Sequence, residues 1–529
     1  MATEITRKAA VRAAAIISLS LLGGCTVGPN FHVPGAFSPA SWFTGRPPPK
    51  APSQPVVLPV STTWWTLFND PELTKLEQRV AAQNLDVRVA TLRLAESRAQ
   101  RNMTAGNMFP TLNGNASYTR EQASKKGVFS ALGGGSPASA ASGAGAGTTA
   151  SGASGAGGGG GIPGSSLQPF DLFQYGFDSV WQIDLWGQVR REIESANATI
   201  EATAAQRRAV LLTALAEVAR DYIDLRGTQR QLQIARQNLQ TADQLLKLTR
   251  ERAAGGLTTD LDVANARAQR ATIAAEIPQL EQQESVSINA LSLLLGEPPN
   301  ALRGELATPK PVPPIPPAVP VGLPGELLRR RPDIQQAEAK LHAATADVGV
   351  AVSDFFPQIS LSGSVSLQAL QAKDLANWAA STYAFGPSIT LPIFQGGQLR
   401  AQLTLRKAQQ KEAALTYQKT VLQAFHEVDN ALTAYDAEQR RRAHLVNAVK
   451  QNKAALSLAQ QRYRQGIANY IEVLDAERSL LSAQQTLATS TATVSTDLVA
   501  IYKALGGGWQ TAFPHHPVQA AKGGSPARS

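Results

Sequence analysis

The sequence predicts a mainly α-helical chain with a small transmembrane β part, built from two copies of one unit. Three observations lead to this fold class. The residues around Gly256 recur around Gly466, 210 positions later. Each copy contains two segments in which apolar and polar residues alternate. Each copy also contains a long stretch without proline, residues 188–254 and 398–465, that favours one uninterrupted helix.

Composition sets the outer limits of the interpretation. The 529 residues are 43% hydrophobic and 17% charged, with a net charge of +10, which suits two or three domains rich in long helices. Basic and acidic residues alternate along the helical stretches, which is typical of solvated helix faces and not of a nucleic-acid surface. There is no phosphate loop, nucleophile elbow or metal-ligand spacing. We therefore expect no enzyme activity, no metal site, no cofactor and no nucleic-acid partner.

Residues 1–24 are predicted to be a lipoprotein signal peptide. Three basic residues precede an apolar run at 13–22 that is too short to span a bilayer. Gly23 and Gly24 then precede Cys25, the sole cysteine, in a pattern that resembles a bacterial lipobox. We expect Cys25 to be acylated, and no internal disulfide is possible. The residue after the cysteine, Thr26, is not aspartate, so the lipobox points to the outer membrane. The alternative is an ordinary signal peptide with an incidental cysteine.

The duplication defines the domains. The offset of 210 residues holds from about 183 to 296, whereas upstream the offset is 247, so the first copy holds 37 extra residues. The extra length coincides with a Gly/Ala/Ser tract within 131–167, which cannot bury enough apolar surface to order and is expected to be an exposed loop. The predicted parts are an N-terminal segment with the first repeat, a Pro-rich linker, the second repeat and a flexible tail: 25–308, 309–324, 325–509 and 510–529.

Each copy begins with a helical pattern, near 72–105 and 325–353, which a Phe-Pro pair ends. Alternating segments follow, first at 112–118 and 359–367, then at 173–185 and 383–393. In the second pair, aromatic and aliphatic residues share one face and polar residues the other. This pattern is typical of barrel strands that face lipid on one side and a wet lumen on the other. The alternative is a half-buried strand in a soluble sandwich.

Four strands cannot close a barrel, and an open sheet edge is not tolerated in lipid. The strands therefore predict an oligomer, either a dimer with eight strands or a trimer with twelve. A barrel of eight is filled by its own side chains, so conduction favours twelve or more.

The two long helices would each run roughly 100 Å at about 1.5 Å per residue. Each is expected to turn at its glycine and return to about 295 or 505, with Pro278 kinking or breaking the first return helix. Because these helices follow the strands directly, we expect them to extend the barrel as a helical tube. A structural rod is the alternative.

Several stretches together resemble a known family. They are CTVGPNF at 25, WWTLFNDPEL at 64, LLRRRPDIQQAE at 327, GPSITLPIFQGGQLRA at 386 and IYKALGGGW at 501. The chain resembles the TolC-like outer-membrane factors, most closely the OprM/NodT-type efflux lipoproteins. The resemblance implies a homotrimeric 12-stranded β-barrel, continued by a periplasmic α-helical barrel with an equatorial belt of N-terminal, linker and C-terminal segments.

The same resemblance implies passive conduction of drugs or other small toxic molecules across the periplasm and the outer membrane. It implies a periplasmic adaptor protein and an inner-membrane pump, of RND type, as partners, together with outer-membrane lipid. Two alternatives stay open, a duct for type I protein or polysaccharide secretion and a non-conducting lipid-anchored scaffold.

The resemblance also implies a closed gate at the periplasmic tip. The gate positions of TolC, and the constriction positions of the OprM branch, fall on Asp262, Tyr463, Ile471, Glu472, Asp475 and Arg478. Three copies of Asp475 around one axis would raise each other's pKa and hold cations, with Arg478 or Tyr463 as a latch. The alternative is an ordinary helix surface with an ion pair between Asp475 and Arg478.

The two copies differ at the tip. The first has Asn265 where the second has Asp475, so we expect the second tip to carry the constriction and the first to support it. An apolar residue beside each turn glycine suggests a partner contact, here with the adaptor. The predicted contact residues are Gly256, Leu257, Gly466 and Ile467.

Overall fold

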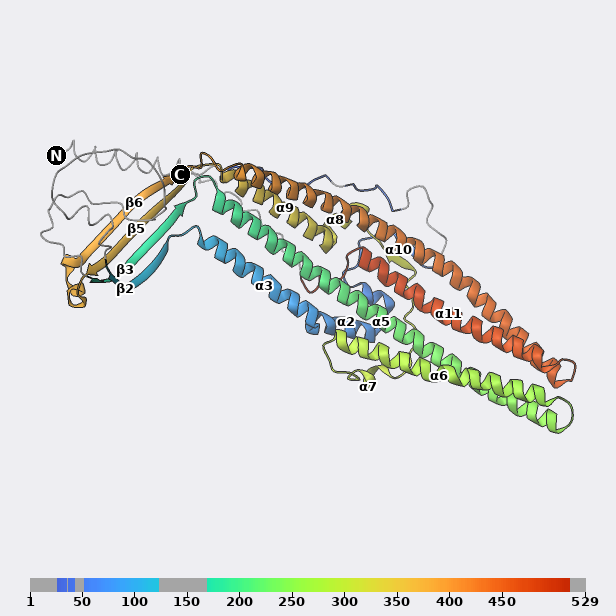
Figure 1. Cartoon of the computed structure of the whole chain (residues 1–529). Helices are drawn as coiled ribbons and strands as arrows, with labels where there is room; N and C mark the ends of the chain where they lie inside the picture. Colours follow the sequence, from blue (N-terminus) through green and yellow to red (C-terminus); the bar gives the residue numbers. More distant parts are fainter. Residues whose placement is uncertain (1–25, 36, 43–51, 123–168, 514–529) are drawn as a thin grey trace, which may run out of the picture. The chain divides into compact units, whose positions relative to one another are not determined.

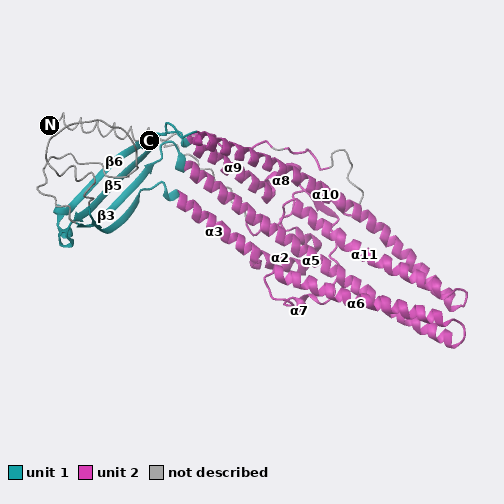
Figure 2. Cartoon of the chain, in the orientation of Figure 1, with its two compact units in different colours: residues 1–26, 105–189, 353–396 teal, residues 27–104, 190–352, 397–529 magenta. Residues whose placement is uncertain are grey.

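The computed structural model describes residues 26–35, 37–42, 52–122 and 169–513, which fall into two compact units (Figure 1, Figure 2). One unit holds Thr26 with residues 105–189 and 353–396, and the other holds 27–104, 190–352 and the chain from 397 onward. The predicted signal peptide, Cys25, the Gly/Ala/Ser tract and the tail beyond residue 513 lie outside the described residues.

The first unit is a four-stranded antiparallel sheet in the order β2-β3-β5-β6. Its strands lie where the alternating patterns predict them: β2 Thr111–Glu121, β3 Phe170–Ile183, β5 Gln358–Ala369 and β6 Ser381–Thr390. The short 3-10 helices η3 (Ala372–Ala376) and η4 (Trp378–Ala380) connect the last two strands.

The two faces of this sheet differ in chemistry. Phe177, Val365 and Tyr383 lie directly opposite one another on three adjacent strands and are 62%, 54% and 72% exposed. Residues in register share one face, so this row forms an exposed apolar face. The adjacent row is polar, and there the Asn113 Nδ2 donates to Asp178 Oδ2 over 3.1 Å. Within the part of the chain that the structure describes, β2 and β6 have no outer partner strand.

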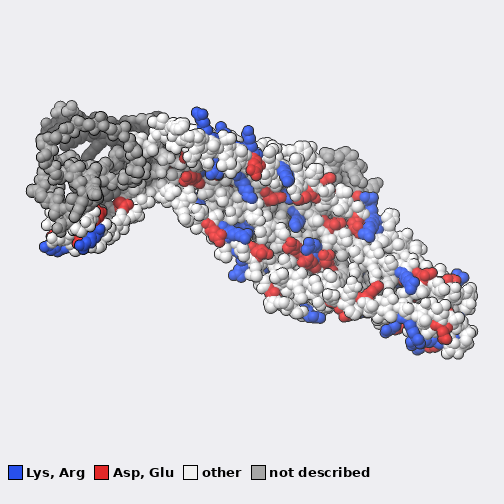
Figure 3. All heavy atoms as spheres, in the orientation of Figure 1, with Lys and Arg blue, Asp and Glu red and all other residues white. Residues whose placement is uncertain are grey.

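The second unit is helical, and its long helices match the prediction closely. Helices α5 (Gln188–Ala254) and α10 (Gln398–Arg464) have 67 residues each, and the return helices α6 (Asp260–Leu294) and α11 (Tyr470–Ala504) have 35 each. Acidic and basic side chains are mixed over the surface of these helices (Figure 3). The equal lengths of the two hairpins are the structural counterpart of the sequence repeat.

The structure shows where these helices are interrupted. Helix α6 continues through Pro278, so the break considered for this position is absent. The helical pattern near 72–105 forms two helices, α2 (Pro71–Gln83) and α3 (Leu85–Gly106), separated by Asn84. The Asn84 side chain donates to Leu294 O over 2.8 Å and accepts from the Val87 amide over 3.0 Å, so it caps the second helix.

In the second copy, the region predicted as helix near 325–353 also divides. It contains the 3-10 turn η2 (Pro324–Glu326), the short helix α8 (Leu327–Arg330) and α9 (Pro332–Ser353). Pro332 at the first position of α9 fixes the start of the helix, since its missing amide would have no intrahelical partner there.

The core of the helical unit brings together residues from the N-terminal and C-terminal parts of the described chain. The 3-10 helix η1 (Trp64–Phe68) places Trp64 flat against Tyr502 of α11, with ring centroids 5.6 Å apart and an interplanar angle of 8°. The Trp64 indole donates to Gly507 O over 3.2 Å. Gly508 has φ +119, and a Cβ there would stand 3.0 Å from the indole nitrogen. The stretches WWTLF and IYKALGGGW are therefore packing partners.

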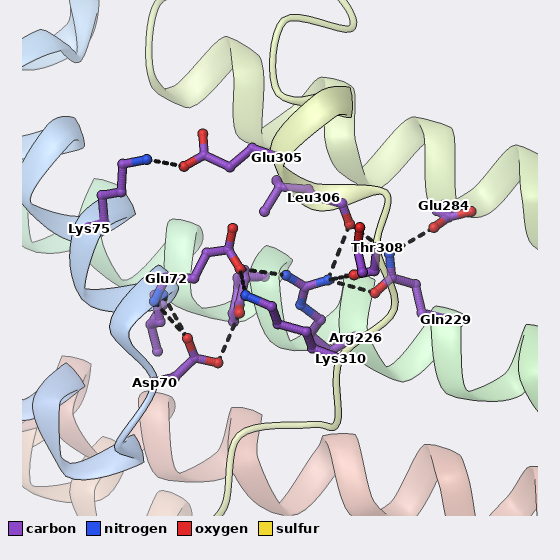
Figure 4. Close-up of polar contacts among 12 residues, drawn as sticks. Asp70, Glu72, Lys75, Arg226, Gln229, Glu284, Glu305, Leu306, Thr308 and Lys310 are labelled. Carbon is purple, nitrogen blue, oxygen red and sulfur yellow. Dashed lines mark hydrogen bonds and ion pairs between the residues drawn. The ribbon is translucent and has the colours of Figure 1, made fainter.

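A buried arginine anchors the segment that joins the two repeats (Figure 4). The Arg226 side chain is 0% exposed and pairs with Glu72 over 3.2 Å. Its Nη1 donates to Gln229 Oε1 and to the carbonyls of Leu306 and Thr308, at 2.7, 3.2 and 2.9 Å. A buried guanidinium needs such partners to offset the loss of water. Helix α5 thereby holds the chain just after α7 (Arg303–Leu306).

A glutamine at equivalent positions of the two copies binds a backbone carbonyl of the crossing segment in each copy. Gln229 Nε2 donates to Leu306 O over 2.8 Å, and Gln439, 210 residues later, donates to Ser53 O over 3.2 Å. The Ser53 amide returns a bond of 3.1 Å to Gln439 Oε1. Strand β1 (Gln54–Val56) follows and pairs in parallel with β4 (Ala318–Pro320) of the linker. N-terminal and linker segments thus form a belt across both long helices.

Candidate functional site

The two hairpin tips lie at the same end of the helical unit (Figure 1). Gly256 and Gly466 have φ of +71 and +78, a left-handed conformation that glycine adopts without strain. In the second tip the Gly466 amide donates to Tyr463 O over 3.0 Å and the Ile467 amide to Arg462 O over 2.9 Å. This pair of bonds is the Schellman motif, which ends a helix in a tight turn. The first tip repeats it.

The start of each return helix is capped by its own loop. Asp262 forms a capping box with Thr259, since each side chain accepts the backbone amide of the other residue, and Thr258 also donates to Asp262. In the second copy the Asn469 side chain accepts the Glu472 amide over 3.2 Å. The predicted gate residue Asp262 therefore has a structural partner within its own tip.

Tyr463 lies inside the tip, where it is 2% exposed and in edge contact with Tyr470, with ring centroids 5.9 Å apart. The Arg252 guanidinium of the first hairpin stands 4.7 Å above the Tyr463 ring. Arg252 Nη1 also donates to Arg464 O, in the last turn of α10, over 3.2 Å. A cation at a helix C-terminus and over an aromatic face is doubly stabilised. Arg252 thereby links the two tips, a role that no pattern in the sequence indicates.

The remaining predicted residues of the second tip lie at the surface. Glu472 pairs with Arg462 over 3.4 Å, with both side chains about half exposed, so the pair contributes less than about 1 kcal/mol. Ile471 is 49% exposed. Asp475 is exposed and has no ion pair among the residues that the structure describes.

Arg478 does not pair with Asp475 in the described chain. Its Nε donates instead to Gln269 Oε1 of the first hairpin over 3.0 Å, and Gln269 is 4% exposed. Further side-chain bonds join the hairpins away from the tip. They run from Gln485 to Glu276 at 2.7 Å, from Asn238 to Gln484 at 3.0 Å and from Gln231 to Thr489 at 3.1 Å. The two hairpins of one chain are therefore joined by polar contacts along their length.

Glu477 is a buried acid that sequence reasoning missed. It is 1% exposed, and neither carboxylate oxygen has a hydrogen-bond partner within the described residues. Burial raises its pKa to about 7, against the opposing charge of the adjacent Arg478. One signal was present. Glu477 falls on the stripe of Tyr470, Val473 and Leu480, which are all buried on one face of α11.

Four exposed apolar residues mark the ends of the hairpins. Leu257 and Ile467 are 69% and 64% exposed, and Leu261 and Ile471 are 66% and 49% exposed. The offset of 210 relates the members of each pair. Leu261 is the one that the sequence prediction did not include.

Nowhere in the described residues is a group of His, Cys, Asp or Glu placed to hold a metal ion. The helices that the structure describes include none that is long and apolar enough to cross a membrane.

A family model described as "Outer membrane efflux protein" matches residues 76–297 and 323–507. The chain belongs to the outer membrane efflux protein family. It is 32% identical over 495 residues to the "Probable efflux pump outer membrane protein TtgC" of Pseudomonas putida, covering 93% of this chain and 94% of that one. It is 31% identical over 495 residues to the "Pyoverdine export outer membrane protein OpmQ" of Pseudomonas aeruginosa, with 93% and 95% covered.

The structure agrees with the sequence relatives. The outer-membrane channel OprN superposes with a TM-score of 0.78 at 34% identity, covering 92% of this chain and 100% of that one. The predicted resemblance to TolC-like efflux channels is confirmed, and so is the fold class of a mainly helical chain with a β part. The chain is an outer-membrane channel protein of an efflux system and extends into the periplasm. Its relatives are channel proteins and not enzymes.

Proposed function

We propose that three copies of this chain form a duct that passively conducts small toxic molecules out of the cell. The observation that carries the proposal is the sheet, which has an exposed apolar row on one face and, among the residues that the structure describes, no partner strand at the outer edges of β2 and β6. Three sheets joined edge to edge give a closed barrel of twelve strands, wide enough to leave a lumen. Two sheets would give eight strands and a filled interior.

We place the gate of this duct at Asp475. The side chain is exposed and unpaired among the described residues, while Arg478 is occupied by Gln269. Threefold symmetry would bring three such carboxylates together around the axis, where they repel one another and attract cations. Tyr463 and Arg252 would support the gate indirectly, because they hold the two tips together. The first tip, with Asn265 at the matching position, supports this ring and adds no charge to it.

The partners are proposed from the surface of the tips. Leu257, Leu261, Ile467 and Ile471 present apolar side chains at the exposed end of both hairpins, a pattern that favours a protein contact. A periplasmic adaptor, joined to an inner-membrane pump of RND type, would bind there. Cys25 would be acylated and anchor each chain in outer-membrane lipid, as its lipobox context predicts.

The exported compounds are proposed as small organic molecules, because the relatives named above serve an efflux pump and pyoverdine export. Deletion of the gene, followed by growth tests on a panel of antibiotics, solvents and detergents, tests this. We expect hypersensitivity to some compounds and its reversal by the wild-type gene. Unchanged sensitivity to every compound, together with loss of a secreted protein or polysaccharide, would favour the secretion duct instead.

A further inference from the structure

A polar cluster that includes none of the predicted gate or tip residues surrounds the first described segment of the chain. The segment Val27–Phe31 lies against α5 and α9, where its backbone meets the side chain of Arg191. Arg191 is 3% exposed, so its guanidinium must find partners inside the protein. It finds three of its four in this short segment.

The contacts use the whole donor fork of the arginine. Arg191 Nε donates to Val27 O over 3.2 Å, and Nη2 donates to Gly28 O over 3.4 Å and to Asn30 Oδ1 over 2.7 Å. Its Nη1 donates to Glu194 Oε2 over 2.7 Å. Only a planar guanidinium offers donors in this arrangement, so lysine could not replace it.

Glu194 connects the arginine to an aromatic contact. Its other carboxylate oxygen lies 3.0 Å from His342 Nε2, and the His342 ring is stacked on Phe31 with centroids 4.4 Å apart. Partial burial opposes ionisation of Glu194, but the hydrogen bonds from Arg191 and His342 hold its pKa below the ordinary value. The carboxylate is therefore charged at neutral pH and fixes both neighbours.

Two glycines allow the segment to approach so closely. Gly28 has φ +91, and a Cβ added to it would stand 2.5 Å from the Cα of Gly349 in α9. A Cβ on Gly349 would stand 2.9 Å from the Arg191 side chain. A Cβ at Gly28 would require the backbone to move, and a Cβ at Gly349 would require the Arg191 side chain to move, because real Cβ atoms do not approach this closely.

The duplication shows that this arrangement is specific to the first copy of the long helix. At the repeat offset of 210, Arg191 and Glu194 correspond to Ala401 and Thr404. At the upstream offset of 247, His342 and Gly349 correspond to Ala95 and Asn102. A feature that only stabilised the helix pairs would be expected in both copies. A feature that holds an N-terminus is needed once in each chain, and it occurs once.

We propose that residues 27–31 form an N-terminal clasp, in which Arg191 positions the start of the mature chain at a fixed place. Within the other unit, Thr26 packs against Gly187, where an added Cβ would stand 2.8 Å from the threonine methyl. Gly187 follows the end of β3 at Ile183 by four residues. Thr26 is therefore held beside the chain that follows β3. The acylation proposed for Cys25 would attach the lipid one residue before this segment.

The test reports on the clasp without depending on the lipid. The chain is exported behind an ordinary cleavable signal peptide with Cys25→Ser, and a nitroxide label is attached at His32→Cys, an exposed position just after the clasp. We expect slow label motion in this parent protein. Arg191→Gln and Gly28→Ala should each increase the rotational rate about tenfold, toward that of a free terminus. Arg236→Gln is the matched control, since Arg236 lies on the same helix, 56% exposed.

The outcomes separate the two proposals. Unchanged motion in both Arg191→Gln and Gly28→Ala overturns the clasp, and the Gly28 variant keeps the test valid if loss of Arg191 prevents folding. Fast motion in the parent, with slow motion only in the acylated protein, also overturns it, because the lipid would then hold the segment. Acylation is read separately from the mass of the mature N-terminal peptide of the unaltered chain. Absence of acyl mass refutes the anchor and leaves the clasp result standing.

Discussion

Glu477 gives the tip a pH dependence that can be worked out from its surroundings. The side chain is 1% exposed among Tyr470, Val473 and Leu480, with no hydrogen-bond partner for either oxygen within the described residues. Burial raises its pKa from the ordinary 4.5 to about 7. Because packing raises the pKa of Glu477, the packed tip is more stable when this carboxyl is neutral than when it is ionised. Tip stability is therefore highest below pH 4.5, falls as the pH rises to 7 and is constant above it.

The magnitude follows from the two pKa values. Each pH unit between them changes the free energy by about 1.4 kcal/mol, so ionisation costs the packed tip about 3 kcal/mol above pH 7. Glu477→Gln keeps the volume and removes the charge. At pH 8 the variant tip should therefore open less often than the wild-type tip by a factor of about 300. At pH 5 the two tips should differ by only about fourfold.

Hydrogen exchange of the tip peptides, read by mass spectrometry, measures this opening. Wild type and variant are compared at the same pH, so the intrinsic pH dependence of exchange cancels in the ratio. Glu472→Gln is the control, because Glu472 is 45% exposed and its ion pair contributes little. A ratio of wild type to Glu477→Gln that is the same at pH 5 and pH 8 would refute the reasoning.

Three further variants test the contacts that hold the helical unit together. Arg226→Ala removes a fully buried cation from four partners and should lower the free energy of unfolding, measured by thermal unfolding, by about 3–5 kcal/mol. For Arg236→Ala, at an exposed position, the same free energy should fall by less than about 1 kcal/mol. Gly466→Ala should destabilise the second tip by about 1–2 kcal/mol in hydrogen exchange, because φ is +78, whereas Gly304→Ala, in open space at ordinary φ, should not. Tyr463→Phe should change tip stability by less than about 1 kcal/mol, since the hydroxyl lies a long 3.5 Å from Thr249; a larger loss would show that the hydroxyl latches the tip.

The elements of this fold were predictable where a periodic pattern ran without interruption. The stretches at 188–254 and 398–465 contain no proline, and the helices α5 and α10 end within one residue of them. The apolar alternation located the four strands of the larger sheet, because the side-chain period of two is visible in the sequence alone. Duplication strengthened the assignment of these helices and strands, since the same pattern occurs in both copies.

Interruptions that depend on distant contacts were not predictable. The break at Asn84 is fixed by a bond to the carbonyl of Leu294, on a helix 210 residues away. The continuity of α6 through Pro278 was not predictable either, because a proline inside a helix favours a kink or a break. The helix propensity of a local segment contains no information about contacts with distant parts of the chain.

The candidate gate shows the same division. The tip glycines and Asp475 could be located from the repeat and the family resemblance, but their partners could not. Arg252 and Gln269 act on the second hairpin from the first, so their roles emerge only when the hairpins are packed side by side. Arg191 is a similar case, since its partners Val27, Gly28 and Asn30 lie more than 160 residues earlier in the chain.

Single-channel conductance in planar bilayers tests the central claim most directly. The claim is that the chain forms a conducting barrel that closes at Asp475, with Arg478 in support. We predict a small, mostly closed conductance for the wild-type protein and a severalfold higher open probability for the Asp475→Ala/Arg478→Ala double variant. Asn265→Ala, at the matching position of the first tip, should behave like wild type. Equal conductance of the double variant and the wild type would contradict a gate at this tip, and absence of conductance in all three would contradict the channel itself.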